Sequence, residues 1–213
     1  MNSLLRAVVF LAALRVSADD LESLHIVNVN IDLKPGWTLQ LHTRARTFEY
    51  VGSFNQGRVG PVLMWQAAPR FTTLAGYYFI NQSTRVTHDP YNIHRVWGGG
   101  QYRVLRSESW SLDARGLMER FFSNQFNDYW RWRSRAMFSK TTRIGMPYAS
   151  GEALLQQGIW YGRYTAGMNW QPHRRLIVGA GYEYRDAPRG PGSHVIATFV
   201  QWTAHRHTPP HID

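Results

Sequence analysis

The sequence contains no cysteine, so a disulfide framework and a thiolate metal site are both excluded. Lysine is scarce as well, because Lys and Arg together number 24 and all but Lys34 and Lys140 are arginine. Beyond the N-terminal segment, no apolar run approaches the roughly 20 residues that a membrane-spanning helix needs. The mean hydropathy of −0.39 fits a water-soluble chain and equally a transmembrane β-barrel, in which only alternate residues face lipid.

The charge that is present is strongly one-sided. Lys and Arg number 24 and Asp and Glu number 14, which gives a formal net charge of +10. Arginine makes planar, multi-donor contacts with carboxylates and phosphates that lysine cannot reproduce. Three partners suit such a chain: nucleic acid, anionic lipid headgroups, or the protein's own carboxylates. The length of 213 residues makes one domain the default expectation.

Residues 1–18 have the organisation of a cleaved signal peptide. Arg6 supplies positive charge, residues 7–14 form a short apolar stretch, and the small or permissive residues 16–18 precede the expected cleavage site. An N-terminal membrane anchor is the alternative, but the apolar stretch is shorter than a spanning helix. We therefore expect an exported protein whose mature chain begins at Asp19.

Hydrophobicity alternates with a period of two along most of the mature chain. The sharpest example lies within residues 126–139, where Arg131, Arg133 and Arg135 share one face of a strand. On a helix these arginines would scatter around the axis. The opposite face of the strand carries Trp130, Trp132, Ser134, Ala136 and Phe138. Similar alternation occurs at residues 27–33, 37–46, 95–104, 110–121, 163–170 and 174–185.

These segments predict an all-β fold of ten to twelve strands. Residues 59–67 and 70–80 also look like strands, although their two faces cannot be told apart, and no segment of the mature chain predicts a helix. Long antiparallel strands need protected edges, and closure into a barrel protects all of them. We expect one antiparallel up-and-down barrel over residues 19–203, with an even number of strands and both termini in the periplasm. Residues 204–213 are expected to be a disordered tail.

Two features favour a transmembrane barrel with a polar interior. The polar faces combine arginine with carboxylates and amides, which suits a confined hydrogen-bonded network. Aromatic residues gather toward strand ends, as in the aromatic girdles of outer-membrane barrels. A soluble barrel or sandwich with an aromatic core is the alternative. The charge network expected in the lumen consists of Asp32, His42, Arg44, Arg46, Arg95, Arg103, Asp113, Arg115, Glu119, Arg131, Arg133, Arg135, Glu152, Arg163, Glu183 and Arg185.

Short motifs follow one another in order between residues 71 and 202. They are His94-Arg95-Val96-Trp97, Ala114-Arg115 with Met118-Glu119-Arg120-Phe121, Tyr129-Trp130-Arg131-Trp132-Arg133, Glu152, Arg163 with Gly167, Gly181-Tyr182 with Tyr184, and His194. This series resembles domain of unknown function family 2490, an uncharacterised group of outer-membrane barrels. The resemblance implies a secreted β-barrel and no particular activity. The family usually has a glutamate before the His-Arg pair, where this chain has Ile93, so one interior charge partner is expected to be missing.

The arginine ladder allows three interpretations. The arginines could pair with carboxylates and fill a narrow lumen, or they could line an anion-selective path, since arginine rings favour anions. Single-stranded nucleic acid is the third ligand class, because residues 130–135 interleave aromatics with arginines. The signal peptide argues against nucleic acid, as does the placement of the aromatics and arginines on opposite faces of the strand.

No motif identifies a catalytic nucleophile, a metal site or a cofactor site. Outer-membrane hydrolases use Ser, His and an acid, and the candidates here are His42, His94, His194, Ser109, Ser111, Ser134 and Ser139. His205, His207 and His211 lie in a proline-broken tail, where metal binding would be adventitious. The sequence offers no phosphate-binding glycine loop and no His-Glu-x-x-His zinc helix.

The sequence therefore predicts an integral outer-membrane protein, either a narrow anion-permissive pore or a structural scaffold. A lipid-modifying outer-membrane enzyme and a soluble periplasmic β-barrel binding protein are the alternatives. The expected partners are outer-membrane lipid, lipopolysaccharide and, during biogenesis, the barrel-assembly machinery. No nucleic acid partner and no cofactor are expected.

Overall fold

The computed structural model describes residues 21–48, 53–84, 87–186 and 192–205. The expected signal peptide and residues 206–213 of the expected tail lie outside this part of the chain. Within it the regular elements are β-strands, and no helix there is long and apolar enough to cross a membrane. The strands are β1 (Leu21–Lys34), β2 (Trp37–Phe48), β3 (Ser53–Ala68), β4 (Phe71–Ser83), β5 (Pro90–Arg106), β6 (Trp110–Ser123), β7 (Tyr129–Lys140), β8 (Met146–Gln156), β9 (Ile159–His173), β10 (Leu176–Arg185) and β11 (Ser193–His205).

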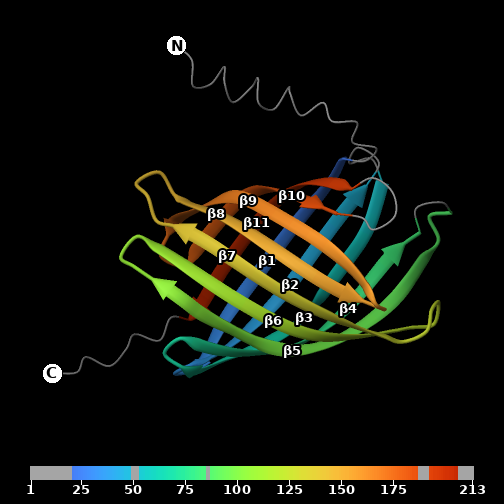
Figure 1. The fold of residues 1–213 in the computed structure, drawn as a ribbon, viewed down its shortest axis with the longest axis horizontal. Helices are drawn as coiled ribbons and strands as arrows, with labels where there is room; N and C mark the ends of the chain where they lie inside the picture. Colours follow the sequence, from blue (N-terminus) through green and yellow to red (C-terminus); the bar gives the residue numbers. More distant parts are fainter. Residues whose placement is uncertain (1–20, 49–52, 85–86, 187–191, 206–213) are drawn as a thin grey trace, which may run out of the picture.

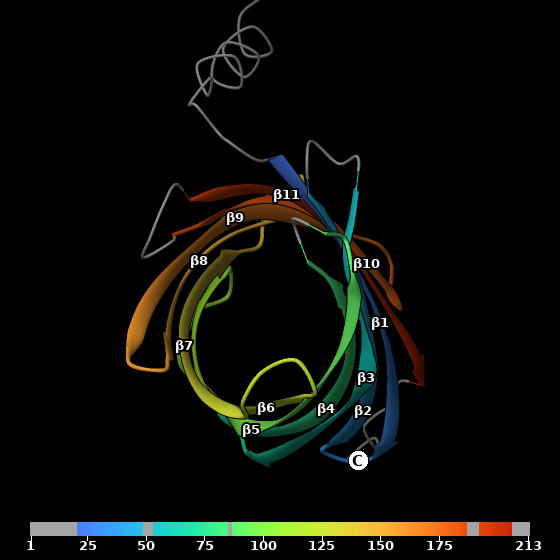
Figure 2. The same cartoon turned by 90° about the vertical axis from the view of Figure 1, so that its right-hand side faces the viewer.

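The eleven strands form one closed barrel, in which each strand pairs with its sequence neighbours and β11 closes onto β1. Figure 1 shows the tilted strands from the side, and Figure 2 shows the ring that they form when viewed near the barrel axis. Neighbouring strands are antiparallel, but β1 and β11 are parallel, with Leu21 opposite His194 and Trp202 opposite Val29. The prediction of a single β-barrel is confirmed.

The prediction of an even number of strands is wrong. Directions alternate along the chain, so the first and last of eleven strands run the same way and can close the barrel only as a parallel pair. We call the rim where β1 and β11 begin the proximal rim and the rim where they end the distal rim. β1 starts at one rim and β11 finishes at the other, so the first and last described strands do not begin and end on one side of the barrel (Figure 1). The termini themselves, which were expected in the periplasm, lie outside the described residues.

Alternating burial follows from the alternating sequence. In β7 every second residue is partly buried and the others are exposed, without exception over the strand. Trp130 is 56% exposed on the outside, whereas Arg131, Arg133 and Arg135 point into the barrel and bond or face residues of other strands there. This arrangement places the arginine row inside and the apolar row outside.

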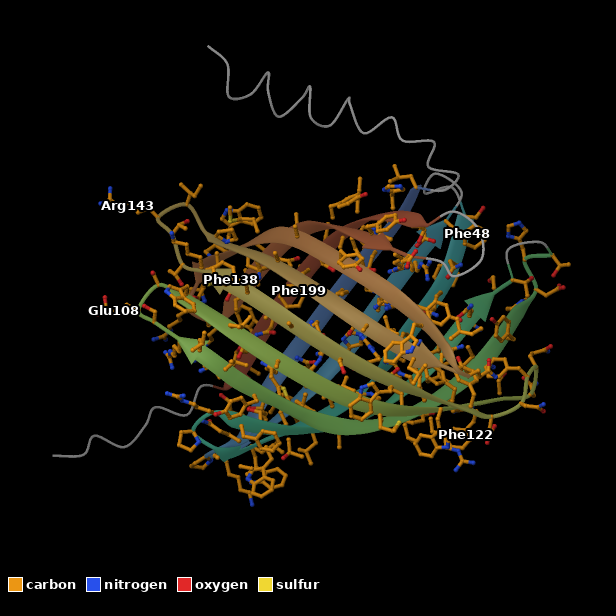
Figure 3. The ribbon with its side chains drawn as sticks, viewed as in Figure 1. Phe48, Glu108, Phe122, Phe138, Arg143 and Phe199 are labelled. Carbon is orange, nitrogen blue, oxygen red and sulfur yellow. The ribbon has the colours of Figure 1, made fainter. Side chains whose placement is uncertain are left out.

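Outward-facing aromatic side chains gather near both rims. Those toward the distal rim are Trp65, Phe71, Tyr102, Trp110, Phe138, Trp170 and Trp202. Those toward the proximal rim include Phe54, Trp130, Trp132 and Trp160. Figure 3 labels Phe138 near the distal end of β7. Two further aromatics near strand ends, Tyr129 and Tyr161, instead lie at inward positions of their strands, and Tyr129 stacks on Phe121 with ring centroids 4.6 Å apart.

The interior is not polar throughout. A buried hydrophobic cluster on the inner faces of β3 to β6 is formed by Val62, Tyr78, Ile80, Ile93 and Phe121, with Met64, Tyr91, Trp97, Phe126 and Tyr129 packed against it. Ile93, the residue before the His94-Arg95 pair, belongs to this cluster. The cluster therefore fills one side of the lumen with apolar side chains.

Candidate functional site

All sixteen residues expected in the lumen lie in strands, on the faces that point into the barrel. Most of them form the polar network described below. Three lie closer to the distal rim: Asp32 accepts a hydrogen bond from Thr38 Oγ1 at 3.0 Å, and Arg103 pairs with Asp113 at 3.4 Å while the Arg103 side chain stays 40% exposed. The sequence therefore placed these side chains on the correct faces of their strands, although it could not supply their partners.

Glu119 is the most heavily engaged carboxylate. It is 0% exposed and lies 2.5 Å from Arg131 Nη2, 3.0 Å from Arg133 Nη1 and 3.6 Å from Arg95 Nη1. These three guanidiniums come from β5 and β7, the two neighbours of β6. One buried negative charge thus holds three positive charges, which makes Glu119 the centre of this wall of the lumen.

The ion pairs continue around the barrel from Glu119. Arg133 Nη2 lies 2.6 Å from Glu152 Oε1, and Glu152 Oε2 accepts from Arg163 Nη1 at 3.2 Å. Arg163 Nε then lies 3.5 Å from Glu183. Arg115 also approaches Glu152, at 3.8 Å. Carboxylates and guanidiniums therefore alternate along the inner face from β6 to β10.

The same chain of charges crosses the parallel seam. Arg185 Nε lies 2.5 Å from Glu183, and its Nη1 donates to Glu22 at 2.9 Å. Glu22 is 0% exposed and also pairs with Arg46 at 2.5 Å. β10 and β2 are thus linked through β1, across β11. Glu22 could not be predicted from the sequence. Ser23 and His25 place polar groups on the outer face of β1, so the polar and apolar residues do not alternate there.

The wall formed by β2 and β3 is different, because neutral groups hold its arginines. Arg58 is directly opposite Arg44 in the ladder. Arg58 donates to His42 Nε2, at 3.1 Å from Nε and 2.7 Å from Nη2, and Arg44 donates to Gln56 Oε1. The guanidinium of Arg58 also lies 4.5 Å from the ring centroid of Tyr78. Sequence analysis missed Arg58, since it could not assign the faces of this region.

Positive charge exceeds negative charge on the inner face of the described strands. The arginines there are Arg44, Arg46, Arg58, Arg95, Arg103, Arg115, Arg131, Arg133, Arg135, Arg163 and Arg185, and the carboxylates are Glu22, Asp32, Asp113, Glu119, Glu152 and Glu183. Among the described residues, no carboxylate lies within 4.0 Å of Arg44, Arg58 or Arg135. On the described strands the inner face therefore carries more positive than negative charge, and three of its arginines make no ion pair within 4.0 Å with a described carboxylate.

Comparison with known protein families identifies the family of this chain. The profile of a family described as "Protein of unknown function (DUF2490)" matches residues 22–195. The chain belongs to the DUF2490 family. No curated protein and no solved structure matches it. The match begins earlier than the motifs suggested, and it includes Glu22, Arg44 and Arg58 of the DUF2490 lumen.

The candidate catalytic residues do not meet in this DUF2490 barrel. His42 is inside, bonded to Asn28 and Arg58. His94 and His194 lie on the outer face, where each is bonded to a tyrosine, Tyr77 and Tyr182 respectively. Among the serines, Ser111 and Ser139 bond each other and Ser134 accepts from Trp132 Nε1, while Ser109 lies in the turn before β6. The described residues contain no cluster of three or more His, Cys, Asp or Glu that could hold a metal ion.

One polar cluster on the outer face was not foreseen. Ser23 Oγ lies 3.2 Å from His25 Nε2, and His25 Nδ1 lies 2.8 Å from Thr198 Oγ1. Thr47 Oγ1 lies 2.8 Å from Ser23 Oγ and accepts the backbone N–H of Ser23 at 3.2 Å. The cluster joins β1, β2 and β11 on the outside of the parallel seam. No local sequence pattern predicts this cluster, because its members come from strands that are far apart in the chain.

The outer face also has a shallow hollow of about 850 Å³ across β5 to β9. Its floor consists largely of small residues, among them Ala114, Ala136 and Gly151, and Tyr102 and Tyr164 stand beside it. Because these side chains are small, the outer surface is recessed at this place.

Proposed function

We propose that this DUF2490 protein is an integral outer-membrane barrel with a narrow, anion-permissive lumen. The outer face supports the membrane placement, since it is apolar and carries aromatic side chains toward both rims, as transmembrane barrels do. The inner face supports it as well, because an interior of arginine and carboxylate inverts the arrangement of a soluble barrel. On this proposal the barrel contacts outer-membrane lipid and lipopolysaccharide and is inserted by the barrel-assembly machinery.

The observation that carries the anion preference is the surplus of guanidinium groups over carboxylates on the inner face. Rings of arginine favour anions in pores, and rings of carboxylate favour cations. On this proposal the passage is narrow, because the barrel has eleven strands and a buried apolar cluster fills part of its interior. We therefore expect small anions to pass and large solutes to be excluded.

Conductance in planar bilayers tests this function. Under a KCl gradient, the reversal potential of the wild-type barrel is expected to show anions as the main carriers. Arg58→Gln removes a positive charge that makes no ion pair with a described carboxylate, so it should shift the reversal potential toward cations. Arg120→Gln is the matched control, because Arg120 lies outside the lumen and pairs with Asp128 in an exposed position. A cation preference in the wild type, or equal shifts in both variants, would contradict the proposal.

Hydrolysis of lipid esters at the outer face is a second candidate function, favoured by the bonds of Ser23 to His25 and of His25 to Thr198. A serine, a histidine and an orienting group in this order form the arrangement of acyl-transfer enzymes. Ser23 Oγ would attack the ester carbonyl carbon and pass its proton through His25 Nε2 to the departing alcohol oxygen. Water would then release the fatty acid and restore Ser23. Ser23 is only 6% exposed, which ranks this function second.

The second candidate has its own test. The purified barrel is incubated in vesicles of phosphatidylglycerol and phosphatidylethanolamine, and released fatty acid is measured by mass spectrometry. Activity in the wild type that Ser23→Ala abolishes and Ser139→Ala retains would establish it. Ser139 is a suitable control because its hydroxyl lies inside the barrel, bonded to Ser111. Equal release from both variants, or none from the wild type, would exclude it.

A further inference from the structure

We propose that the wall of β2 and β3 contains a binding site for a tetrahedral oxyanion of the phosphate or sulfate class, between Arg44 and Arg58. The inference deepens the proposed function, on which it rests for access of solutes to the lumen. It is carried by two neighbouring guanidiniums that face the lumen and have no carboxylate within 4.0 Å among the described residues. Neither residue is fully buried.

Uncharged groups hold Arg58 in place through hydrogen bonds. His42 Nε2 accepts from Arg58, so the ring proton is on Nδ1, which donates to Asn28 Oδ1 at 2.8 Å. His42 is therefore an uncharged acceptor that positions Arg58 and leaves its positive charge intact. Tyr78 supports this position, with Arg58 and Arg95 each 4.5 Å from its ring centroid.

Arg44 is held in the same manner. Its Nη2 donates to Gln56 Oε1, and Gln56 Nε2 donates in turn to Gln82 Oε1 at 2.7 Å. The Nε of Arg44 is buried and has no hydrogen-bond partner in the structure. A buried donor without an acceptor is costly, and an anion oxygen in the lumen would remove that cost.

The charges around Arg44 reinforce the need for an anion. The groups that act on it most strongly include the guanidiniums of Arg58, Arg46, Arg163 and Arg185. Glu183 also interacts with Arg44, but its oxygens are already engaged by Arg163 and Arg185. Among the described residues, the arginines of this corner therefore outnumber the carboxylates Glu22, Glu152 and Glu183 that pair with them.

The geometry selects the class of anion. Arg44 and Arg58 are directly opposite each other on neighbouring strands, whose backbones lie about 4.8 Å apart. Two planar, multi-donor forks at that spacing match an anion with several oxygens, to which guanidinium bonds in a bidentate manner. Chloride has one charge and no directional acceptors, so we expect phosphate or sulfate to bind more tightly than chloride.

Thermal unfolding with inorganic phosphate tests the site without requiring a pore. The barrel folded in zwitterionic detergent is titrated with phosphate against chloride at constant ionic strength, and folding is followed by gel mobility before boiling. A ligand that binds the folded state raises the unfolding temperature saturably. Arg44→Gln and Arg58→Gln should each weaken the apparent phosphate affinity by about tenfold or more, as the loss of charge-assisted hydrogen bonds does. Arg103→Gln is the control, since it removes the same charge from the lumen near the distal rim, away from this site.

The results of this titration either support or overturn the proposed site. A saturable phosphate effect that is lost in both site variants and kept in Arg103→Gln supports the proposal. The absence of saturation in the wild type, or an equal effect in all variants, overturns it. Where a glutamine variant does not fold, Arg44→Lys and Arg58→Lys keep the charge and remove the fork, and retained affinity in both would likewise overturn it. Competition by phosphatidylglycerol added to the detergent would assign the effect to a lipid headgroup and overturn the lumenal site.

Conductance distinguishes this inference from the function on which it rests. A barrel that binds phosphate at Arg44 and Arg58 but passes no current would refute the pore and leave the site standing. A barrel that conducts anions without a saturable phosphate effect would refute the site alone.

Discussion

Replacing Glu119 with glutamine is expected to lower the free energy of unfolding by about 3–5 kcal/mol, the cost of removing one partner from a buried ion pair. Glutamine keeps the shape of the side chain but not its charge. Arg95, Arg131 and Arg133 would then face one another without the negative charge that now lies between them. The loss is large because Glu119 is fully buried, so water cannot take its place.

Urea unfolding in lipid vesicles, followed by tryptophan fluorescence, measures this effect. Asp128→Asn is the matched control, because it also removes a carboxylate that pairs with an arginine. In that pair both side chains are more than 40% exposed and lie 3.4 Å apart, and exposed pairs contribute about 0–1 kcal/mol. If Glu119→Gln proved no more costly than Asp128→Asn, the buried network could not be what holds β5, β6 and β7 together.

The sequence was sufficient where one side of a strand is charged and the other apolar. β7 is the clearest case, since the spacing of Arg131, Arg133 and Arg135 predicts that all three point inward. The alternation is strong there because the outer residues face away from the interior, whereas the charged inner residues need partners inside the barrel. The expected faces of His42 and Arg44 in β2 agree with the structure for the same reason.

The sequence was insufficient where both faces of a strand are apolar. In β3, Val62 points inward and is 3% exposed, while Val59 points outward and is 50% exposed. The hydrophobic cluster inside the barrel thus removes the contrast between the faces, and Arg58 could not be assigned to the lumen. A period-two pattern identifies the inner and outer faces of a strand only when the two faces differ in polarity.

The way in which the barrel closes also could not be predicted from local sequence patterns. The seam pairs the first described strand with the last, as in Leu24 opposite Ala197, and no short segment encodes a partner so distant in the chain. The strand count is equally hidden, since the odd number becomes visible only once the parallel pair is seen. The ion pairs that cross the seam, from Arg185 to Glu22 and on to Arg46, follow from that closure.

Placing an arginine on the outer face is the second change with a large expected effect. Ala136 lies near the middle of β7 on the outer face, directly opposite Ala114 of β6 and Gly151 of β8. Trp132 and Phe138 flank it on the same face toward the two rims. At the middle of a lipid-facing band, arginine costs about 2–4 kcal/mol in a transmembrane barrel. Leucine at the same position remains apolar and should be tolerated in lipid.

The free energy of unfolding of Ala136→Arg in lipid vesicles therefore tests whether this face of the barrel contacts acyl chains, with Ala136→Leu as the control. We predict a loss of about 2–4 kcal/mol for arginine and little change for leucine. A water-exposed face would give the opposite order: arginine would stay within about 0.5 kcal/mol of the wild type, as surface substitutions usually do, and leucine would promote aggregation. That result would contradict the placement of this barrel in a membrane.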